Sequence, residues 1–110
     1  MAPRNAAERR AATWYRLRGY RVVEQNLWIA GYELDLVLQR AGTVVFCEVK
    51  SKSGTAFGDP LEMVTPEKVR RIRLAAEAWL ASHRDYERHT VRFDVVAVRD
   101  GRLECLRNAF

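Results

Sequence analysis

Apolar and polar positions repeat along this chain with two different periods, which predict two helices and five strands. Over residues 5–18, small and aromatic residues recur at helical spacing: Ala7, Ala11, Ala12, Trp14 and Tyr15. Gly19 predicts the end of this helix. Glu8 projects into the middle of the apolar stripe. It either complements the helix dipole in the first turn or faces the interior for a functional reason.

Runs of β-branched and aromatic residues separated by turn residues predict strands over residues 20–28, 33–39, 43–50, 90–98 and 102–106. Two-residue turns are expected at Ala41-Gly42 and Asp100-Gly101. The alternation in the second strand predicts one face with Leu34, Leu36 and Leu38, and an opposite face with Glu33, Asp35 and Val37.

A second helix is expected to begin with Thr65 as its N-cap and Pro66 as its first residue, and to end near Ser82. Lys68 lies at the edge of its apolar stripe. This lysine either points to the interior or lays its stem along the apolar surface. The polar loop 51–65 either contacts a substrate or only connects two elements. The stripe comprises Val69, Ile72, Ala75, Ala76, Trp79 and Leu80.

The composition predicts one globular domain over residues 1–110, of the α/β class with a central sheet flanked by helices. Apolar residues make up 48% of the chain and charged residues 30%, which is ordinary for a folded domain. Neither a signal peptide nor an apolar run of about 20 residues is visible, so the cytoplasm is the expected location and a membrane is not an expected partner. Cys47 and Cys105 are expected to be buried free thiols, and His83 and His89 lack the spacing of a zinc site.

The net charge of +5 is unevenly distributed along the chain. Two segments are rich in arginine and lysine, one near the N-terminus and one in the second predicted helix. Two such clusters in a short chain favour a polyanionic partner such as nucleic acid. Their members are Arg4, Arg9, Arg10, Arg16, Arg18 and Arg21, and Lys68, Arg70, Arg71 and Arg73.

The apolar strand 43–50 ends in two charged residues, Glu48 and Lys50, which share one face because they are two residues apart. Buried charges need partners or ligands. A two-residue turn at Ala41-Gly42 gives paired residues whose numbers add up to 83, so Asp35 is expected opposite Glu48, and Glu33 opposite Lys50. Asp94, in a later strand, is expected to have a structural partner such as an arginine.

This acidic patch has the composition of a site for phosphodiester hydrolysis. Asp35, Glu48 and the Val49 carbonyl oxygen are candidate ligands for Mg²⁺ or Mn²⁺. Lys50 is the candidate for stabilising the attacking water or the phosphate charge. Glu33 and Glu8 are expected to hold outer-shell waters, and Lys68 to contact the phosphate. The alternative is a cross-strand ion-pair network on a solvent face, because Asp-x(12)-Glu-x-Lys also occurs by chance.

Longer motifs give the chain a specific resemblance. It resembles the PD-(D/E)XK nuclease superfamily and, within it, the small bacterial YraN-like family of predicted endonucleases, distantly related to Holliday junction resolvases. Ala7, Tyr32 and Ser51-Lys52 depart from the usual family pattern, and none of these departures removes a ligand. The motifs include Gly31-Tyr32-Glu33-Leu34-Asp35-Leu36, Val45-Phe46-Cys47-Glu48-Val49-Lys50, Arg92-Phe93-Asp94-Val95-Val96 and Asn108-Ala109-Phe110.

The resemblance implies a restriction-endonuclease-like αβββαββ core with metal ligands at Asp35 and Glu48 and a catalytic lysine at Lys50. It also implies supporting roles for Glu8, Glu33 and Lys68. The expected function is a metal-dependent DNA endonuclease acting on branched or recombination DNA, with a homodimer by analogy to resolvases. Two alternatives stay open. One is a nuclease fold that binds nucleic acid without cutting it, and the other is a subunit whose basic faces bind an acidic protein.

Overall fold

The computed structural model describes residues 6–52 and 64–110 of the chain. The predicted order of helix, three strands, helix and two strands is confirmed, with a short 3₁₀ helix before the fourth strand. The elements are α1 (Ala6–Arg16), β1 (Arg21–Ile29), β2 (Tyr32–Arg40), β3 (Thr43–Lys52), α2 (Pro66–Ser82), η2 (Arg84–Tyr86), β4 (Thr90–Arg99) and β5 (Arg102–Leu106).

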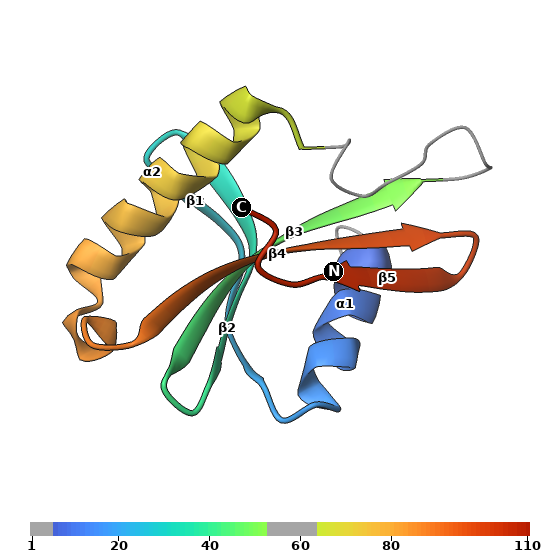
Figure 1. The fold of residues 1–110 in the computed structure, drawn as a ribbon, viewed down its shortest axis with the longest axis horizontal. Coiled ribbons are helices and arrows are strands. Elements are labelled where there is room, and N and C mark those ends of the chain that lie inside the picture. Colours follow the sequence, from blue (N-terminus) through green and yellow to red (C-terminus); the bar gives the residue numbers. More distant parts are fainter. Residues whose placement is uncertain (1–5, 53–63) are drawn as a thin grey trace.

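The five strands form one mixed sheet in the order β1-β2-β3-β4-β5. Only β3 and β4 run parallel; the other neighbouring strands are antiparallel. The parallel pair needs a crossover connection, and α2 belongs to it. Figure 1 shows α1 on one side of the sheet and α2 on the other. This arrangement confirms the expected α/β class and its restriction-endonuclease-like core.

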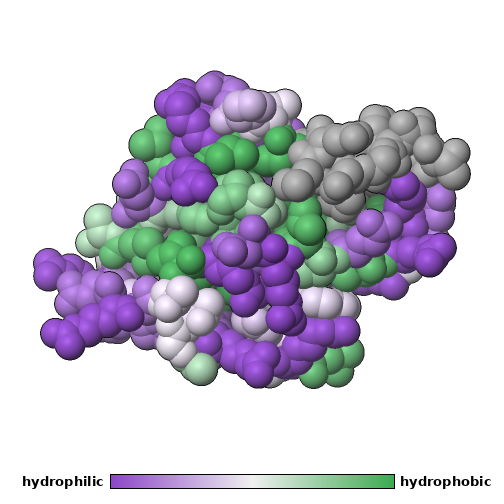
Figure 2. Space-filling view, in the orientation of Figure 1, coloured by the Kyte–Doolittle hydropathy of each residue, from purple (hydrophilic) through white to green (hydrophobic). Residues whose placement is uncertain are grey.

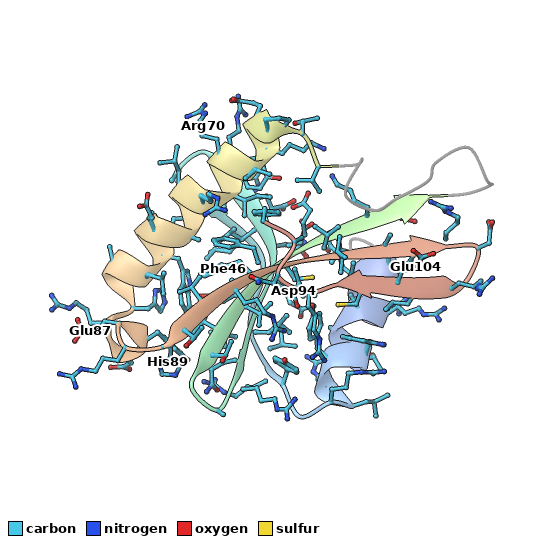
Figure 3. The ribbon with its side chains drawn as sticks, in the orientation of Figure 1. Phe46, Arg70, Glu87, His89, Asp94 and Glu104 are labelled. Atoms are coloured by element: carbon cyan, nitrogen blue, oxygen red, sulfur yellow. The ribbon has the colours of Figure 1, made fainter. Side chains whose placement is uncertain are left out.

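Each helix closes its own hydrophobic core against one face of the sheet. On the α1 side, Tyr15 packs with Leu36 and Val45. On the α2 side, Trp79 packs with Val37 and Phe46, and Figure 3 labels Phe46 between the sheet and α2. Because both faces are covered, the middle strands contain consecutive buried residues rather than an alternation of buried and exposed ones.

The helix ends follow from local sequence. Thr65 is the N-cap of α2, and its Oγ1 accepts a hydrogen bond from the Lys68 backbone N–H at 3.2 Å. Gly19 lies beyond α1 with a φ of 89°, a conformation that glycine adopts without strain. None of the helices in the described part of the chain is both long and apolar enough to cross a membrane.

The predicted register of the β2–β3 hairpin is confirmed from Arg40–Thr43 to Leu36–Cys47, and the expected pairs Asp35–Glu48 and Glu33–Lys50 lie beyond the paired residues. The Asp100-Gly101 turn is confirmed as well. It joins β4 to β5 with φ angles of 49° and 82°, and the flanking Arg99 and Arg102 are paired. These angles match the type I′ turn that the right-handed twist of a hairpin favours.

The expected alternation along β2 is wrong at its beginning. Leu34 packs in the α2-side core with Val37, not in the α1-side core with Leu36 and Leu38. β1 and β2 pair at Gln25–Leu36 and again at Leu27–Leu34, on either side of Asn26 and Asp35. The register of this pair shifts between Val22 and Glu24, and Asn26, with a φ of 52°, interrupts the extended backbone of β1 opposite Asp35.

Asp94 has the arginine partner expected from the sequence. Its carboxylate is fully buried and accepts hydrogen bonds from Arg92 at 2.8 and 2.9 Å and from the Tyr15 hydroxyl at 2.7 Å. The Asn108 N–H donates a fourth hydrogen bond at 3.1 Å. Figure 3 places Asp94 near the centre of the molecule. Of the two free cysteines, Cys47 is buried as expected, whereas Cys105 is only partly buried.

An apolar groove of about 400 Å³ runs between α2 and β4, where Figure 2 shows hydrophobic surface. Leu74 and Val91 line it and are 46% and 37% exposed. Beside it, the Arg73 guanidinium lies over the rings of Phe93 and Phe110.

Candidate functional site

The site forms where β2 separates from β3. Their pairing ends at Leu36–Cys47, whereas β3 stays paired with β4 up to Lys52–Arg99. The Asp35 carboxylate lies beside β3 at this end and accepts a hydrogen bond from the Val49 N–H at 2.8 Å. Since Val49 belongs to the α1-side core, its neighbours Glu48 and Lys50 face the α2 side.

A cavity of about 480 Å³ opens at this end of the sheet. Its walls include five of the six side chains proposed from the sequence, together with the backbone of Val49. The five are Glu8, Glu33, Asp35, Glu48 and Lys50. A somewhat larger hollow of about 540 Å³ lies at the far end of α2, near η2. Its lining mixes apolar residues with two glutamates, one arginine and one histidine, so the first cavity has the denser set of carboxylates.

Glu48 is held by two neighbours. Both of its carboxylate oxygens lie 3.3 Å from the Tyr32 hydroxyl, and the Lys50 ammonium lies 3.0 Å from Oε2. The Glu48 side chain is only 6% exposed, so these contacts replace water. The sequence identified Tyr32 only as a departure from the family pattern, next to Glu33, and not as a site residue.

The Asp35 carboxyl group is partly buried, and its negative charge is poorly compensated by its neighbours. Burial is the main cause that raises its pKa to about 8, and the negative charges of Glu48 and Glu8 raise it further. The Val49 N–H and the Lys50 ammonium lower the pKa, but by less. A bound cation would relieve this crowding of carboxylates, because it favours their ionised forms.

Lys68 reaches the site through Lys50. Burial alone would lower the pKa of the Lys50 ammonium, but hydrogen bonding with the Lys68 side chain and attraction to Glu48 and Asp35 raise it overall. Lys68 therefore contacts the site from α2, which favours its inward alternative. Arg71, one turn further along α2, lines the cavity, and its Nε lies 3.0 Å from Glu67. The sequence placed Arg71 only in the general basic cluster.

Glu8 enters the cavity from the opposite side of the sheet. It is buried in the first turn of α1, and its Oε1 accepts a hydrogen bond from Asn26 Nδ2 at 2.6 Å. Both alternatives for Glu8 therefore agree with its position, since a residue in the first turn can also face inward. The left-handed backbone of Asn26 aims the amide at Glu8. Asn26 is one of the residues that match the family pattern, but no role at the site was expected for it.

The donor set fits a hard divalent cation that retains water ligands. Within residues 6–52 and 64–110, no three histidine, cysteine, aspartate or glutamate side chains are close enough to hold an ion by themselves. Mg²⁺ is usually bound by one or two carboxylates and keeps several waters. Asp35, Glu48 and the Val49 carbonyl oxygen match that requirement. The Tyr32 and Lys50 contacts with Glu48 would have to rearrange.

The mixed sheet between two helices, with a carboxylate and lysine cavity at one end, defines a protein with a restriction-endonuclease-like fold. The family model described as "Uncharacterised protein family UPF0102" matches residues 7–98. The chain belongs to this family, which is the YraN-like family that its motifs indicated.

Individual relatives support the same assignment. A UPF0102 protein of Beutenbergia cavernae is 48% identical over 91 residues, covering 83% of this chain and 76% of the relative. One of Cupriavidus necator is 44% identical over 105 residues, covering 94% and 79%. One of Symbiobacterium thermophilum is 41% identical over 110 residues, covering 96% and 92%. Membership thus rests on matches over most of both chains.

Proposed function

We propose that this protein is a Mg²⁺- or Mn²⁺-dependent endonuclease that hydrolyses phosphodiester bonds in DNA. The observation that supports this proposal most directly is the meeting of Asp35, Glu48 and Lys50 in one cavity, with the Val49 backbone between the last two. The raised pKa of Asp35, which burial causes first and Glu48 second, indicates a site built for a cation.

Each proposed side chain has a role consistent with its position. A bound divalent ion would act as a Lewis acid and lower the pKa of a bound water. Asp35 and Glu48 would hold that ion, with the Val49 carbonyl. Lys50, 3.0 Å from Glu48, orients this carboxylate and would stabilise the negative charge that develops on the phosphate. Glu8 and Glu33 would position ordered water, and Lys68 would contact the phosphate.

The charge distribution favours nucleic acid as the polymer that enters the site. Among the described residues, four carboxyl groups and two cationic side chains line the cavity, although the chain as a whole carries a charge of +5. The excess positive charge therefore lies outside the cavity, and exposed arginines project from both helices. They include Arg9, Arg10 and Arg16 on α1 and Arg70 and Arg73 on α2.

The test is a cleavage assay with plasmid, linear duplex and branched DNA in Mn²⁺ or Mg²⁺. Cleavage is expected from the unaltered protein and should be abolished by Asp35→Ala, Glu48→Ala and Lys50→Met. Glu77→Gln on the exposed side of α2 is the matched control and should cut normally. Calorimetry should show Mn²⁺ binding that Glu48→Gln removes. Cleavage that survives all three site substitutions would refute the proposal.

A non-cleaving DNA-binding module is the second candidate. It is favoured by the contacts of Tyr32 and Lys50 with Glu48, which occupy the carboxylate that a metal would need. This candidate predicts DNA binding that weakens with salt, with a log–log slope of about 0.9 per phosphate neutralised. It also predicts no cleavage in any metal and no effect of Lys50→Met on affinity. A branched substrate and a homodimer are further proposals, tested by comparing DNA shapes and by sedimentation.

A further inference from the structure

One large aromatic side chain at the cavity is left open to solvent. Trp28 on β1 is 66% exposed, and its residue lines the same cavity as Asp35 and Glu48. The other exposed large hydrophobic residues among those described are Leu17, Leu74 and Val91, and none of them lines this cavity. Exposing an indole leaves apolar surface in water, which disfavours the position unless a ligand covers it.

The backbone holds Trp28 firmly in place. Trp28 pairs with Glu33 across the β1–β2 ladder, two residues before a tight turn. That turn consists of Ala30 and Gly31, with φ angles of 52° and 76°. A Cβ added at Gly31 would find no atom within 4 Å, so the approach beside the turn is open. The indole is thus attached to a rigid hairpin at an open entrance.

We propose that Trp28 stacks on an unpaired base next to the phosphate held at the candidate site, and that DNA with an unpaired nucleotide at that point is the preferred substrate. This inference rests on the proposed function, because it takes the phosphate to lie beside Asp35, Glu48 and Lys50. An aromatic ring next to cationic groups matches one nucleotide, since Lys50 and Arg71 suit the phosphate and the indole suits the π-face of the base.

The need for an unpaired base follows from the geometry of nucleic acids. Inside a duplex, the faces of each base are covered by neighbouring bases, so a protein ring can stack only on a base that has left the helix. Stacking also tolerates any base identity, because every base has a π-face. The expected preference is therefore for loops, flaps, junctions or single strands, without a strong sequence preference.

The test compares two variants that both keep an apolar side chain at position 28. Trp28→Phe retains an aromatic face, whereas Trp28→Leu removes it. Affinity is measured in Ca²⁺ for a labelled duplex and for the same duplex with a short unpaired loop. Trp28→Leu should weaken binding to the looped DNA about tenfold and leave duplex binding unchanged. Trp28→Phe should keep most of the affinity, and Leu74→Ala, on the groove beside β4, should match the unaltered protein.

A second readout observes the stack directly. The fluorescent base 2-aminopurine, placed in the unpaired loop, should be quenched by the unaltered protein and by Trp28→Phe, but not by Trp28→Leu. Circular dichroism confirms that each variant is folded. Because Trp28 is exposed, its substitution is not expected to prevent folding. Quenching by the unaltered protein and by Trp28→Phe tests stacking even if the leucine variant cannot be measured.

The outcomes separate this inference from the proposed function. If Trp28→Leu binds looped DNA as well as the unaltered protein does, stacking is refuted, while cleavage that depends on Asp35 and Glu48 would still support the endonuclease. If nothing is cut but looped DNA binds through Trp28, stacking stands and the endonuclease fails. Absence of any DNA binding refutes both. A dimer that only Trp28→Leu dissociates would refute stacking too, because it would assign the indole to pairing of the edge strand β1 with a second copy.

Discussion

The Asp94 carboxylate on β4 and the acidic groups of Asp35 on β2 and Glu48 on β3 have opposite surroundings. The Asp94 carboxylate accepts four hydrogen bonds, two of them from Arg92. Within the described part of the chain, the Asp35 carboxylate accepts a hydrogen bond from the Val49 N–H, and its pKa is raised by burial and by the charge of Glu48. A cavity opens at Asp35, whereas Asp94 is fully enclosed.

A charged residue in an apolar strand can therefore have two different roles. A buried carboxylate that pairs with an arginine and accepts further hydrogen bonds is compensated within the fold and links the elements that supply its partners. Asp94 does so for α1, β4 and the C-terminal segment. A buried carboxylate next to other carboxylates makes the metal-free fold less stable, which proteins tolerate where a ligand restores the balance. Substitutions at Asp94 and at Asp35 should therefore change the stability of the metal-free protein in opposite directions.

The largest effect is expected at Asp94. Asp94→Ala should lower the free energy of unfolding by about 3–5 kcal/mol, because it leaves Arg92 without its counter-charge. Asp94→Asn keeps the shape and one acceptor and should cost less, which keeps the measurement possible. Urea unfolding checks both values. Mn²⁺ binding by the folded fraction should be unchanged; loss of Mn²⁺ binding without loss of stability would contradict the structural role.

Asp35→Asn should act in the opposite direction on the metal-free protein. A carboxyl group with a raised pKa in the folded state holds its proton more tightly there than in the unfolded chain. Its contribution to stability is thus present below about pH 4 and is lost as the pH rises towards about 8. Asparagine removes this titration and still offers an acceptor to the Val49 N–H. The variant should be more stable than the unaltered protein at pH 8.5 by at least about 1.4 kcal/mol, the equivalent of one pKa unit.

The control for this prediction is the pH dependence of the difference in stability. Thermal unfolding of the two proteins should differ most near pH 8.5, and the difference should shrink steadily towards pH 4. Added Mn²⁺ should raise the melting temperature of the unaltered protein and not that of Asp35→Asn, because only a ligand that binds the folded state stabilises it. If Asp35→Asn were less stable than the unaltered protein at pH 8.5, the charge of Asp35 would be compensated by its surroundings, as that of Asp94 is.

Most of the fold could be predicted because the signals are local. Helical spacing in 5–18, the Thr65 cap and the Asp100-Gly101 turn each depend on a few adjacent residues, and all three are confirmed. The short Ala41-Gly42 turn also set the β2–β3 register correctly. That register brings Asp35, Glu48 and Lys50 towards one another, and their roles stay a prediction.

The parts that could not be predicted depend on contacts between distant segments. The change of face at Asp35 lies opposite the left-handed Asn26 on the neighbouring strand, which period-two counting cannot show. The partners of Asp94 come from α1, β4 and the C-terminal segment, so the sequence indicated an arginine but not Tyr15. The contact of Tyr32 with Glu48 depends on where the separated ends of β2 and β3 lie.

The substitutions with the smallest expected effect on stability are at Asn26, and they test why the surroundings of Asp35 and Asp94 differ. Asn26 has a left-handed backbone and lies opposite Asp35, between the pairs Gln25–Leu36 and Leu27–Leu34, whereas Asp94 has no such neighbour among its paired residues. Asn26→Ala must adopt a φ near 52° with a Cβ and without a local hydrogen bond. Asn26→Gly adopts the same φ freely. We expect Asn26→Ala to be about 1 kcal/mol less stable than Asn26→Gly.

Metal binding separates the backbone of Asn26 from its side chain. Both variants lose the 2.6 Å hydrogen bond to Glu8, so both should bind Mn²⁺ about tenfold more weakly, as is typical when an outer partner is removed. The two should be equal to each other in calorimetry while differing in urea unfolding. If Asn26→Gly binds Mn²⁺ like the unaltered protein, the amide does not position Glu8. The acidic cavity would then depend on the left-handed backbone at Asn26 alone.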